Sequence, residues 1–162
     1  MQSEAGLSAA VKWEAEMTDT ADTAYARDMA NFNRHIMEAF RVTGGQPEGM
    51  PTNSPILILH TVGAKSGREL ESPLVYHRDG DRLYVFASAN GADRHPAWYH
   101  NLVANPDVRV EIGTETLPLR ATVLTGEERD RVYREQTERA TQFAGYQQKT
   151  SRVIPVIALH PA

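Results

Sequence analysis

The 162-residue chain contains no cysteine, which excludes disulfide bonds, thiolate nucleophiles and iron–sulfur clusters held by thiolates. No stretch approaches the ~20 consecutive apolar residues that a membrane-spanning helix needs. Residues 1–22 are acidic and lack the apolar core of a secretory signal, and the net charge of -4 argues against general nucleic-acid binding. We therefore expect a cytoplasmic protein of one main domain, with neither a nucleic-acid partner nor an integral membrane segment.

Several catalytic and metal-binding motifs are missing as well. No Gly-x-Gly-x-x-Gly follows a strand-like run, so a Rossmann dinucleotide site is not expected. The six histidines show neither metal-binding spacing on a helix nor a His-Glu-x-x-His, so we expect no metal site. Residues 63–67 match only the end of a P-loop, because the earlier glycine is missing and a strand-like run follows, so an ATPase is not expected.

The turn at residues 63–69, Gly-Ala-Lys-Ser-Gly-Arg-Glu, is the most informative stretch that is present. Apolar, strand-like runs lead into it and out of it. Glycines let backbone N–H groups approach a ligand, and Lys65 and Arg68 supply positive charge for an anion such as a phosphate. A surface turn with two solvated cations explains the same residues, so this stretch alone leaves both interpretations open.

Apolar residues recur every three or four positions from Tyr25 to Phe40, which predicts an amphipathic helix over residues 23–41. This helix either packs on the domain or touches a membrane surface or a lipid-like substrate. Residues 1–22 form a tail that is either disordered or helical. We accordingly divide the chain into this tail and a single domain, residues 23–162.

Residues 56–162 alternate short apolar runs with turn signals, which is typical of antiparallel strands. The expected strands are residues 56–62, 70–78, 83–88, 108–112, 115–124 and 153–159. Pro73 lies within one of them and demands an edge, a bulge or an interrupted ladder, and Pro155 interrupts another, which suits an edge or a bulge. Short strands joined in this way usually close into a barrel or a sandwich, and a small barrel with helices over its openings suits the order of the elements.

Two helices are expected among these strands. One is a short helix over residues 97–104. The other starts at Thr125, which forms a capping box with Glu128, and runs to about Thr141, and Gly145 is expected to break it. Both helices would flank the sheet.

Candidate ligand contacts gather in and around the loop at residues 89–97. Ser88 ends a strand just before the loop, so its hydroxyl either reaches a ligand or bonds its own loop. His95 lies in the loop, where residues of functional sites are common. Trp98 follows as part of the core or as a platform for a cofactor. Farther along the chain, the phenol of Tyr146 either donates a proton or a hydrogen bond to a substrate oxygen or only packs.

Three linked motifs carry a resemblance to a known family: GAKSGRELESPLVY at residues 63–76, ASANGADRHPAWYHNLVANP at 87–106 and YQQKTSRVIPVIAL at 146–159. In order and spacing, over about residues 30–162, the chain resembles the deazaflavin-dependent nitroreductase family. The resemblance implies an α+β fold, a mostly antiparallel six-stranded split β-barrel of the FMN-binding split-barrel type with flanking helices. It also implies binding of coenzyme F420, a deazaflavin with a phosphate and an oligoglutamate tail, used mainly by actinobacteria and methanogens.

The resemblance implies which residues bind this cofactor. The basic turn would hold its phosphate end, through Lys65, Ser66, Gly67 and Arg68. The strand after the turn would border the deazaflavin ring, through Pro73, Leu74 and Val75. The rest of the cleft would be lined by Ser88, Ala89, Asn90, Gly91, Arg94, Trp98 and Asn101. The cations among these residues suit a cofactor with an acidic tail.

The resemblance also implies an enzyme, a coenzyme F420-dependent reductase that transfers a hydride from F420H2 to a quinone or a similar electron-poor small molecule. Its catalytic residues would be Tyr146 and Ser88, and its substrate contacts Phe32, Phe143 and Tyr146. Ala140 and Phe143 stand where the family's reducers of bicyclic nitroimidazoles have tyrosines, which favours quinones over nitro compounds. Membrane-bound menaquinone would suit a peripheral contact of residues 23–41 with the inner face of the cell membrane.

Two other functions stay open at this point. The missing tyrosines also suit a protein that stores or shields F420 without turnover. A split-barrel flavoprotein that uses FMN is the other alternative. The sequence does not predict the oligomeric state.

Overall fold

The computed structural model describes residues 19–45 and 55–162. The chain divides into two compact units between Asn53 and Ser54, and each unit is described by itself. The first contains helix α2 (Asp19–Val42), which confirms the amphipathic helix expected over residues 23–41 and begins four residues earlier. Most of the expected tail, residues 1–18, lies outside the described residues. Within the described ranges, no helix has the length and the apolar character needed to cross a membrane.

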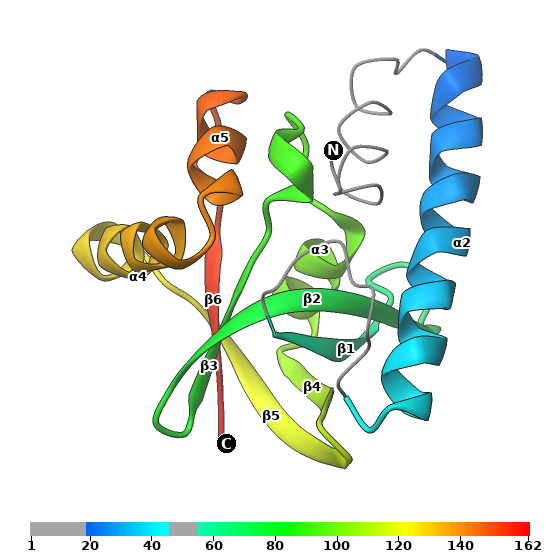
Figure 1. The fold of residues 1–162 in the computed structure, drawn as a ribbon, viewed down its shortest axis with the longest axis horizontal. Coiled ribbons are helices and arrows are strands. Elements are labelled where there is room, and N and C mark those ends of the chain that lie inside the picture. The colour runs from blue at the N-terminus through cyan, green and yellow to red at the C-terminus, as the bar shows by residue number, and fades with distance from the viewer. Residues whose placement is uncertain (1–18, 46–54) are drawn as a thin grey trace. The chain divides into compact units, whose positions relative to one another are not determined.

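Six antiparallel strands close into a barrel in the second unit, residues 54–162 (Figure 1). The strands are β1 (Ile56–Val62), β2 (Glu69–Asp79), β3 (Arg82–Phe86), β4 (Asp107–Ile112), β5 (Glu115–Val123) and β6 (Val156–His160). Around the barrel they follow the order β1-β2-β3-β6-β5-β4, and every neighbouring pair is antiparallel. The expected fold class, an α+β six-stranded split β-barrel with flanking helices, is therefore confirmed.

Alternate residues of the strands fill the inside of the barrel. Leu57 and Leu59 of β1 are fully buried there, together with Val85, Val110 and Leu159 from three other strands. Removing a side chain of this size from water stabilises the fold by about 1.5–3 kcal/mol. Because the interior is packed with apolar side chains, functional groups must come from the ends and the outer face of the barrel.

Pro73 lies where its strand has a paired neighbour on one side only. Pro73 of β2 is opposite Ile58 of β1, whereas the pairing of β2 with β3 begins only at Tyr76. The missing N–H of Pro73 therefore breaks no hydrogen bond with β3, which agrees with the expected edge position. Pro155 lies before β6, so the strand expected from Val153 begins three residues later, at Val156.

Three α-helices and one 3-10 turn connect the described strands: η1 (Ala89–Gly91), α3 (Ala97–Ala104), α4 (Gly126–Arg139) and α5 (Gln142–Gln148). The helix expected over residues 97–104 is confirmed as α3. The predicted capping box is wrong in its geometry: Thr125 is the N-cap of α4, but its side chain makes no capping hydrogen bond. The carboxylate of Glu128 instead lies 3.3 Å from the guanidinium of Arg82 on β3.

The end of α4 also differs from the prediction. The helix ends at Arg139 rather than Thr141, because Ala140 has an extended backbone with φ -139° and ψ 94°. Gly145, which was expected to break the helix, lies inside α5 instead. The physical reason is tertiary: Ala140 and Phe143 both enter a core cluster that α4 and α5 share with the outer face of β3 and β6, so the chain turns at Ala140.

Candidate functional site

The basic turn between β1 and β2 is closed by its own hydrogen bonds. The N–H of Gly63 donates to the carbonyl of Arg68 at 2.7 Å, and the N–H of Gly67 donates to the carbonyl of Gly63 at 3.0 Å. The Ser66 hydroxyl oxygen accepts from the N–H of Arg68 at 3.1 Å. A Cβ atom at position 63 would lie 2.4 Å from that Ser66 oxygen, so a side chain there would displace the hydroxyl. The turn is therefore a defined structure rather than a loose surface loop.

Asn101 of α3 holds this turn in place through its side-chain amide. Its Oδ1 accepts from the N–H of Ala64 at 2.9 Å, and its Nδ2 donates to the hydroxyl of Thr61 at 3.2 Å. The side chain is buried, whereas Asn105, one helical turn later, is exposed and makes only a 3.5 Å contact with the Val62 carbonyl. Asn101 thus connects α3 to the turn, which sequence spacing did not reveal.

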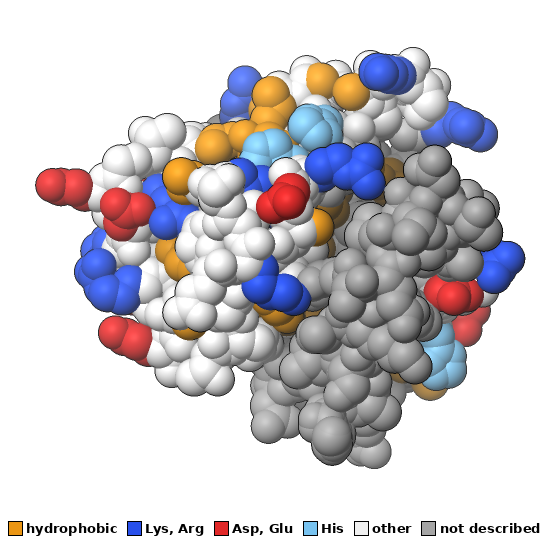
Figure 2. Space-filling view, turned by 90° about the horizontal axis from the view of Figure 1, so that it is seen from above, with side chains coloured by type: hydrophobic (Ala, Val, Ile, Leu, Met, Phe, Trp, Pro, Cys, Tyr) orange, Lys and Arg blue, Asp and Glu red, His pale blue; other side chains and the backbone are white. Residues whose placement is uncertain are grey.

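The cations expected to bind the cofactor are available on the surface. Lys65 and Arg68 on the turn and Arg94 on the next loop are all exposed. None of the three side chains forms a hydrogen bond or an ion pair with another residue in the described part of the chain. Figure 2 shows Lys and Arg side chains on the same face as histidine and apolar side chains. Unpaired ammonium and guanidinium groups fit a ligand with phosphate or carboxylate oxygens.

The loop after β3 has an unusual backbone. Ala89, Asn90 and Gly91 follow one another with φ values of 47°, 56° and 86°. A left-handed conformation costs a residue such as alanine on the order of 1–3 kcal/mol, and such strain is concentrated at functional sites. A Cβ atom on Gly91 would lie 2.8 Å from the Tyr146 carbonyl oxygen, so the loop packs directly against α5. The structure thereby brings together the second and third motifs of the sequence.

Arg152 braces this loop from the segment after α5. Its guanidinium donates to the carbonyls of Ala87 at 3.1 Å, Ser88 at 2.9 Å and Ala92 at 2.8 Å. Burial lowers the pKa of the Arg152 guanidinium below its usual value. Spacing along the sequence does not point to this arginine, because its contacts join residues about 60 positions apart.

His95 completes the brace. Its Nδ1 lies 3.0 Å from the Arg152 guanidinium and accepts a hydrogen bond when the ring is neutral. Burial, and then the charge of Arg152, lower the pKa of His95 below its usual 6.5. The ring also contacts Tyr99 and His100 of α3, at centroid distances of 4.6 and 5.8 Å. His95 therefore links the loop to α3.

The remaining residues of the predicted cleft lie at different depths. Ser88 is half-buried at the start of η1, and its carbonyl also accepts from the N–H of Gly91. Leu74 packs against the barrel core, whereas Val75 packs against the outer cluster under α4 and α5. Pro73 is half-buried on β2. Trp98 is buried in the barrel core, which agrees with the packing alternative for this indole.

The residues expected to contact the substrate divide between the two units. Phe143 and Tyr146 of α5 are buried in the outer cluster, with ring centroids 5.1 Å apart. The hydroxyl of Tyr133 on α4 donates to the Phe143 carbonyl at 2.5 Å, and burial raises the pKa of Tyr133 to about 12. Phe32 belongs to α2 in the first unit, so its contact with substrate stays a prediction.

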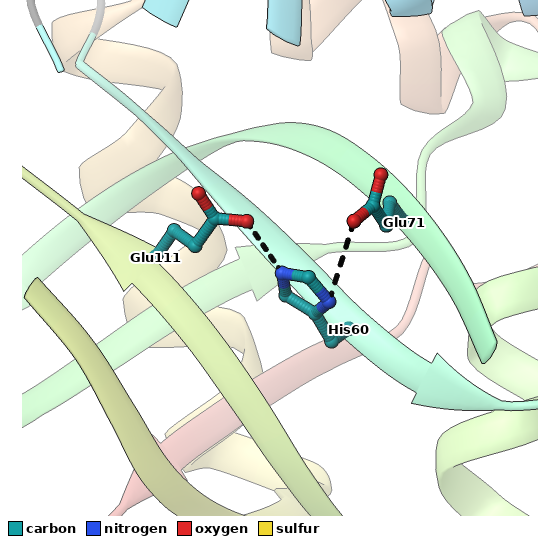
Figure 3. A group of neighbouring side chains, drawn as sticks. All are labelled: His60, Glu71 and Glu111. Atoms are coloured by element: carbon teal, nitrogen blue, oxygen red, sulfur yellow. Dashed lines mark hydrogen bonds and ion pairs between the residues drawn. The ribbon is translucent and has the colours of Figure 1, made fainter. Parts of the chain in front are cut away.

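A second polar cluster lies on three neighbouring strands, β1, β2 and β4 (Figure 3). His60 is buried, its Nδ1 lies 2.6 Å from Glu69, and its Nε2 lies 2.6 Å from Glu111. Glu71 lies 3.7 Å from Nδ1, and Arg109 also binds Glu69. The hydrogen bond from His60 is the main cause that lowers the pKa of Glu69.

The geometry of this cluster would also admit a metal ion. One ligand atom each from His60, Glu71 and Glu111 lies within 4.8 Å of the other two. The expectation of no metal site rested on spacing along the chain, which does not detect ligands brought together from three strands. That expectation stays a prediction.

Comparison with known proteins points to one family. The family model of the F420H2-dependent quinone reductases matches residues 32–161. An F420H2-dependent quinone reductase of Mycobacterium tuberculosis (strain H37Rv) is 39% identical over 124 residues, covering 74% of this chain and 83% of that protein.

Two solved structures agree with this match. The F420-H2 dependent reductase FDR-A is 39% identical with a TM-score of 0.61, over 65% of this chain and 94% of that one. A protein described as a domain-swapped dimer is 34% identical with a TM-score of 0.63, over 86% of this chain and 99% of that one. The expected resemblance to F420-dependent reductases is thereby confirmed, and the chain belongs to the F420H2-dependent quinone reductase family.

Proposed function

We propose that this protein reduces a quinone with a hydride from F420H2, and that its turn at residues 63–68 and its loop at residues 87–95 form the cofactor site. The observation that carries the proposal is the set of exposed cations Lys65, Arg68 and Arg94, which have no partner among the described residues. A cofactor with a phosphate and carboxylates supplies matching oxyanions. An acidic protein thus presents a local basic site for an acidic cofactor.

The architecture of the turn supports its assignment to the phosphate end. Asn101 is buried and uses both atoms of its amide to hold the turn, so Lys65 and Arg68 are presented from a fixed backbone. A site that is already formed binds its ligand without the cost of ordering a loop. Ser66 and Gly67 complete the phosphate-binding turn, whereas Asn101 acts as a positioning residue.

The loop and α5 are assigned to the reacting end of the site. When bound, F420H2 supplies the hydride, and the protein supplies binding, orientation and a proton. Reduction of a quinone to a hydroquinone takes up one hydride and one proton, so a hydrogen-bond donor is needed beside a quinone oxygen. The hydroxyls of Ser88 and Tyr146 are our candidates, because Ser88 starts the strained loop and the backbone of Tyr146 contacts it. Pro73 and Val75 would border the ring from β2.

Titration of the purified protein with F420, followed by cofactor fluorescence, tests the proposal. Saturable binding with a Kd below tens of micromolar is expected, on the order of 7 kcal/mol or more of binding free energy. The absence of binding in that range contradicts the proposal.

The cations of the turn are tested by a double variant. Lys65→Ala combined with Arg68→Ala is expected to weaken F420 binding by at least about tenfold at low salt, since each charged hydrogen bond contributes about 1.5–3 kcal/mol. The factor is expected to shrink at high salt, where screening already weakens the wild-type contacts. Arg134→Ala combined with Arg139→Ala, at two exposed positions of α4, removes the same number of charges and serves as the control. An unchanged affinity in the double variant would mean that the cations are only solvated surface.

Turnover separates an enzyme from a storage protein. Steady oxidation of F420H2 by menadione, lost in Ser88→Ala or Tyr146→Phe, is expected for the reductase. Binding without turnover supports the storage alternative, and a yellow protein after purification supports the FMN alternative. Nitro compounds are weaker candidate substrates, because Ala140 and Phe143 replace the expected tyrosines.

A peripheral membrane contact of residues 23–41 also stays a proposal, supported by the apolar stripe of this helix and by the membrane location of menaquinone. Sedimentation with anionic lipid vesicles tests it, and a protein that stays in the supernatant contradicts it. The oligomeric state is open to measurement by light scattering.

A further inference from the structure

A cavity on the second unit lies outside the proposed cofactor site. It has a volume of about 450 Å³ and is lined by residues of β2 and α4 and by the residue before β1, namely Pro55, Tyr76, His77, Arg78, Gln136 and Arg139. Pockets that bind small molecules have volumes on the order of 300–1,000 Å³. None of these six residues is assigned to the cofactor or to the quinone.

Gln136 is the unusual member of this lining. Its side chain is only 2% exposed, yet its amide forms no hydrogen bond with any residue in the described ranges. Buried side-chain amides without a partner are rare, and each one needs an explanation. An amide at the wall of a cavity finds its partner in whatever fills that cavity.

The rim of the cavity is positively charged. Arg78 donates through Nε to the carbonyl of Gly80 at 3.2 Å, and Arg139 donates through Nη1 to the carbonyl of Glu135 at 3.0 Å. Neither guanidinium forms an ion pair with another described residue. A guanidinium has five N–H donors in a fork that matches a carboxylate or a phosphate, so both keep donors for a ligand.

The remaining side chains provide a surface for a ring. Pro55 is apolar, and the imidazole of His77 lies over the ring of Tyr84, with centroids 5.8 Å apart. Burial lowers the pKa of His77 below its usual 6.5, which favours the neutral ring near pH 7. Two acidic groups are near it, Asp79 and Glu135; the Glu135 carboxylate lies 3.8 Å from His77 and is bound by Arg131 at 3.1 Å.

We propose that this cavity binds a small aromatic oxyanion, a ring compound with a carboxylate or a phosphate group. The oxyanion is held by Arg78 and Arg139 at the rim, and the Gln136 amide bonds a polar group of the ligand at the buried end. The ring lies against His77 and Pro55.

Calorimetric titration of the full-length protein with benzoate and with phenyl phosphate, at constant ionic strength, tests this site. Saturable binding of at least one of them is expected, and the neutral analogue benzamide is expected to bind at least about tenfold more weakly. The anion that binds identifies the ligand as a carboxylate or a phosphate. If neither anion binds saturably, or if benzamide binds equally well, the proposal is overturned.

Variants locate the binding. Gln136→Leu keeps the volume of the side chain and removes its amide, and Arg139→Gln removes a charge at an exposed position that does not endanger folding. Each is expected to weaken binding of the anion by at least about tenfold, whereas Arg134→Gln on the same helix leaves it unchanged. Affinity for F420 is expected to stay the same in all three. Equal anion affinity in Arg139→Gln and Arg134→Gln would overturn the assignment.

Discussion

At the scale of single residues, the site depends on side chains that position others. Asn101 touches the backbone of the basic turn and the hydroxyl of Thr61, and its two amide atoms are both used for this. Because the side chain is buried, loss of its hydrogen bonds is costly to the fold. The charges that we propose to face the ligand, Lys65 and Arg68, therefore depend on an uncharged residue 33 to 36 positions away in the sequence.

Asn101→Leu is expected to lower the free energy of unfolding by about 1–3 kcal/mol, because the N–H of Ala64 loses its partner. F420 affinity is expected to fall as well, although no charge is removed. Chemical denaturation and fluorescence titration measure the two effects. Asn105→Leu is the matched control, since its contact with the Val62 carbonyl is long and exposed. Equal effects of the two substitutions would contradict the positioning role of Asn101.

At the scale of elements, the strained loop depends on the segment between α5 and β6. Arg152 binds three carbonyls and His95, and Gln147 of α5 in turn accepts from the N–H of Ile154 and donates to the carbonyl of Arg152. We therefore expect the left-handed residues at 89–91 to keep their conformation while this segment stays docked. Loop and segment form one hydrogen-bonded unit although about 60 residues separate them.

Arg152→Lys is expected to be strongly destabilising for the loop although the charge is kept. A single ammonium does not reproduce a planar fork that reaches three carbonyls and an imidazole. We expect a loss of about 1–3 kcal/mol in unfolding free energy and faster amide hydrogen exchange at residues 89–92. Arg134→Lys on α4 is the control. Normal exchange protection in Arg152→Lys would show that the loop holds its own conformation.

At the scale of the whole molecule, the barrel closes where β1 meets β4, through three residue pairs. The cluster around His60 lies across this closure and joins β1, β2 and β4. Its carboxylates and cations are therefore expected to make the stability of the barrel depend on pH.

Glu69→Gln tests this dependence. The pKa of Glu69 is lowered from 4.5, chiefly by its hydrogen bond with His60, so the carboxylate stabilises the folded state above pH 4.5. This contribution is lost as the pH falls through the pKa of the folded state, because the unfolded state takes up the proton first. Denaturation at pH 7, 4 and 3 is expected to show that the free energy of unfolding falls less toward acid pH in Glu69→Gln than in the wild type. Glu138→Gln, at an exposed carboxylate of α4, is expected to have the same pH dependence as the wild type.

Local patterns in the sequence determined much of this protein. Alternating apolar residues and short connections predicted six antiparallel strands, since a strand with one face in a core must alternate. The three motifs identified the family and pointed to the turn with Lys65 and Arg68, because these features lie within short stretches of chain. The position of Pro73 at a one-sided pairing followed from its missing N–H.

Only the tertiary structure decided the features that depend on distant residues. Helix α4 ends before Ala140, because Ala140 and Phe143 both pack into the cluster of α4 and α5. Gly145 stays inside α5, although glycine has a low helix propensity, because tertiary packing overrides that propensity. The roles of Asn101 and Arg152 depend on partners 37 to 65 positions away along the chain. Their hydrogen bonds leave no pattern in sequence spacing, because it is the closure of the barrel that brings the partners together.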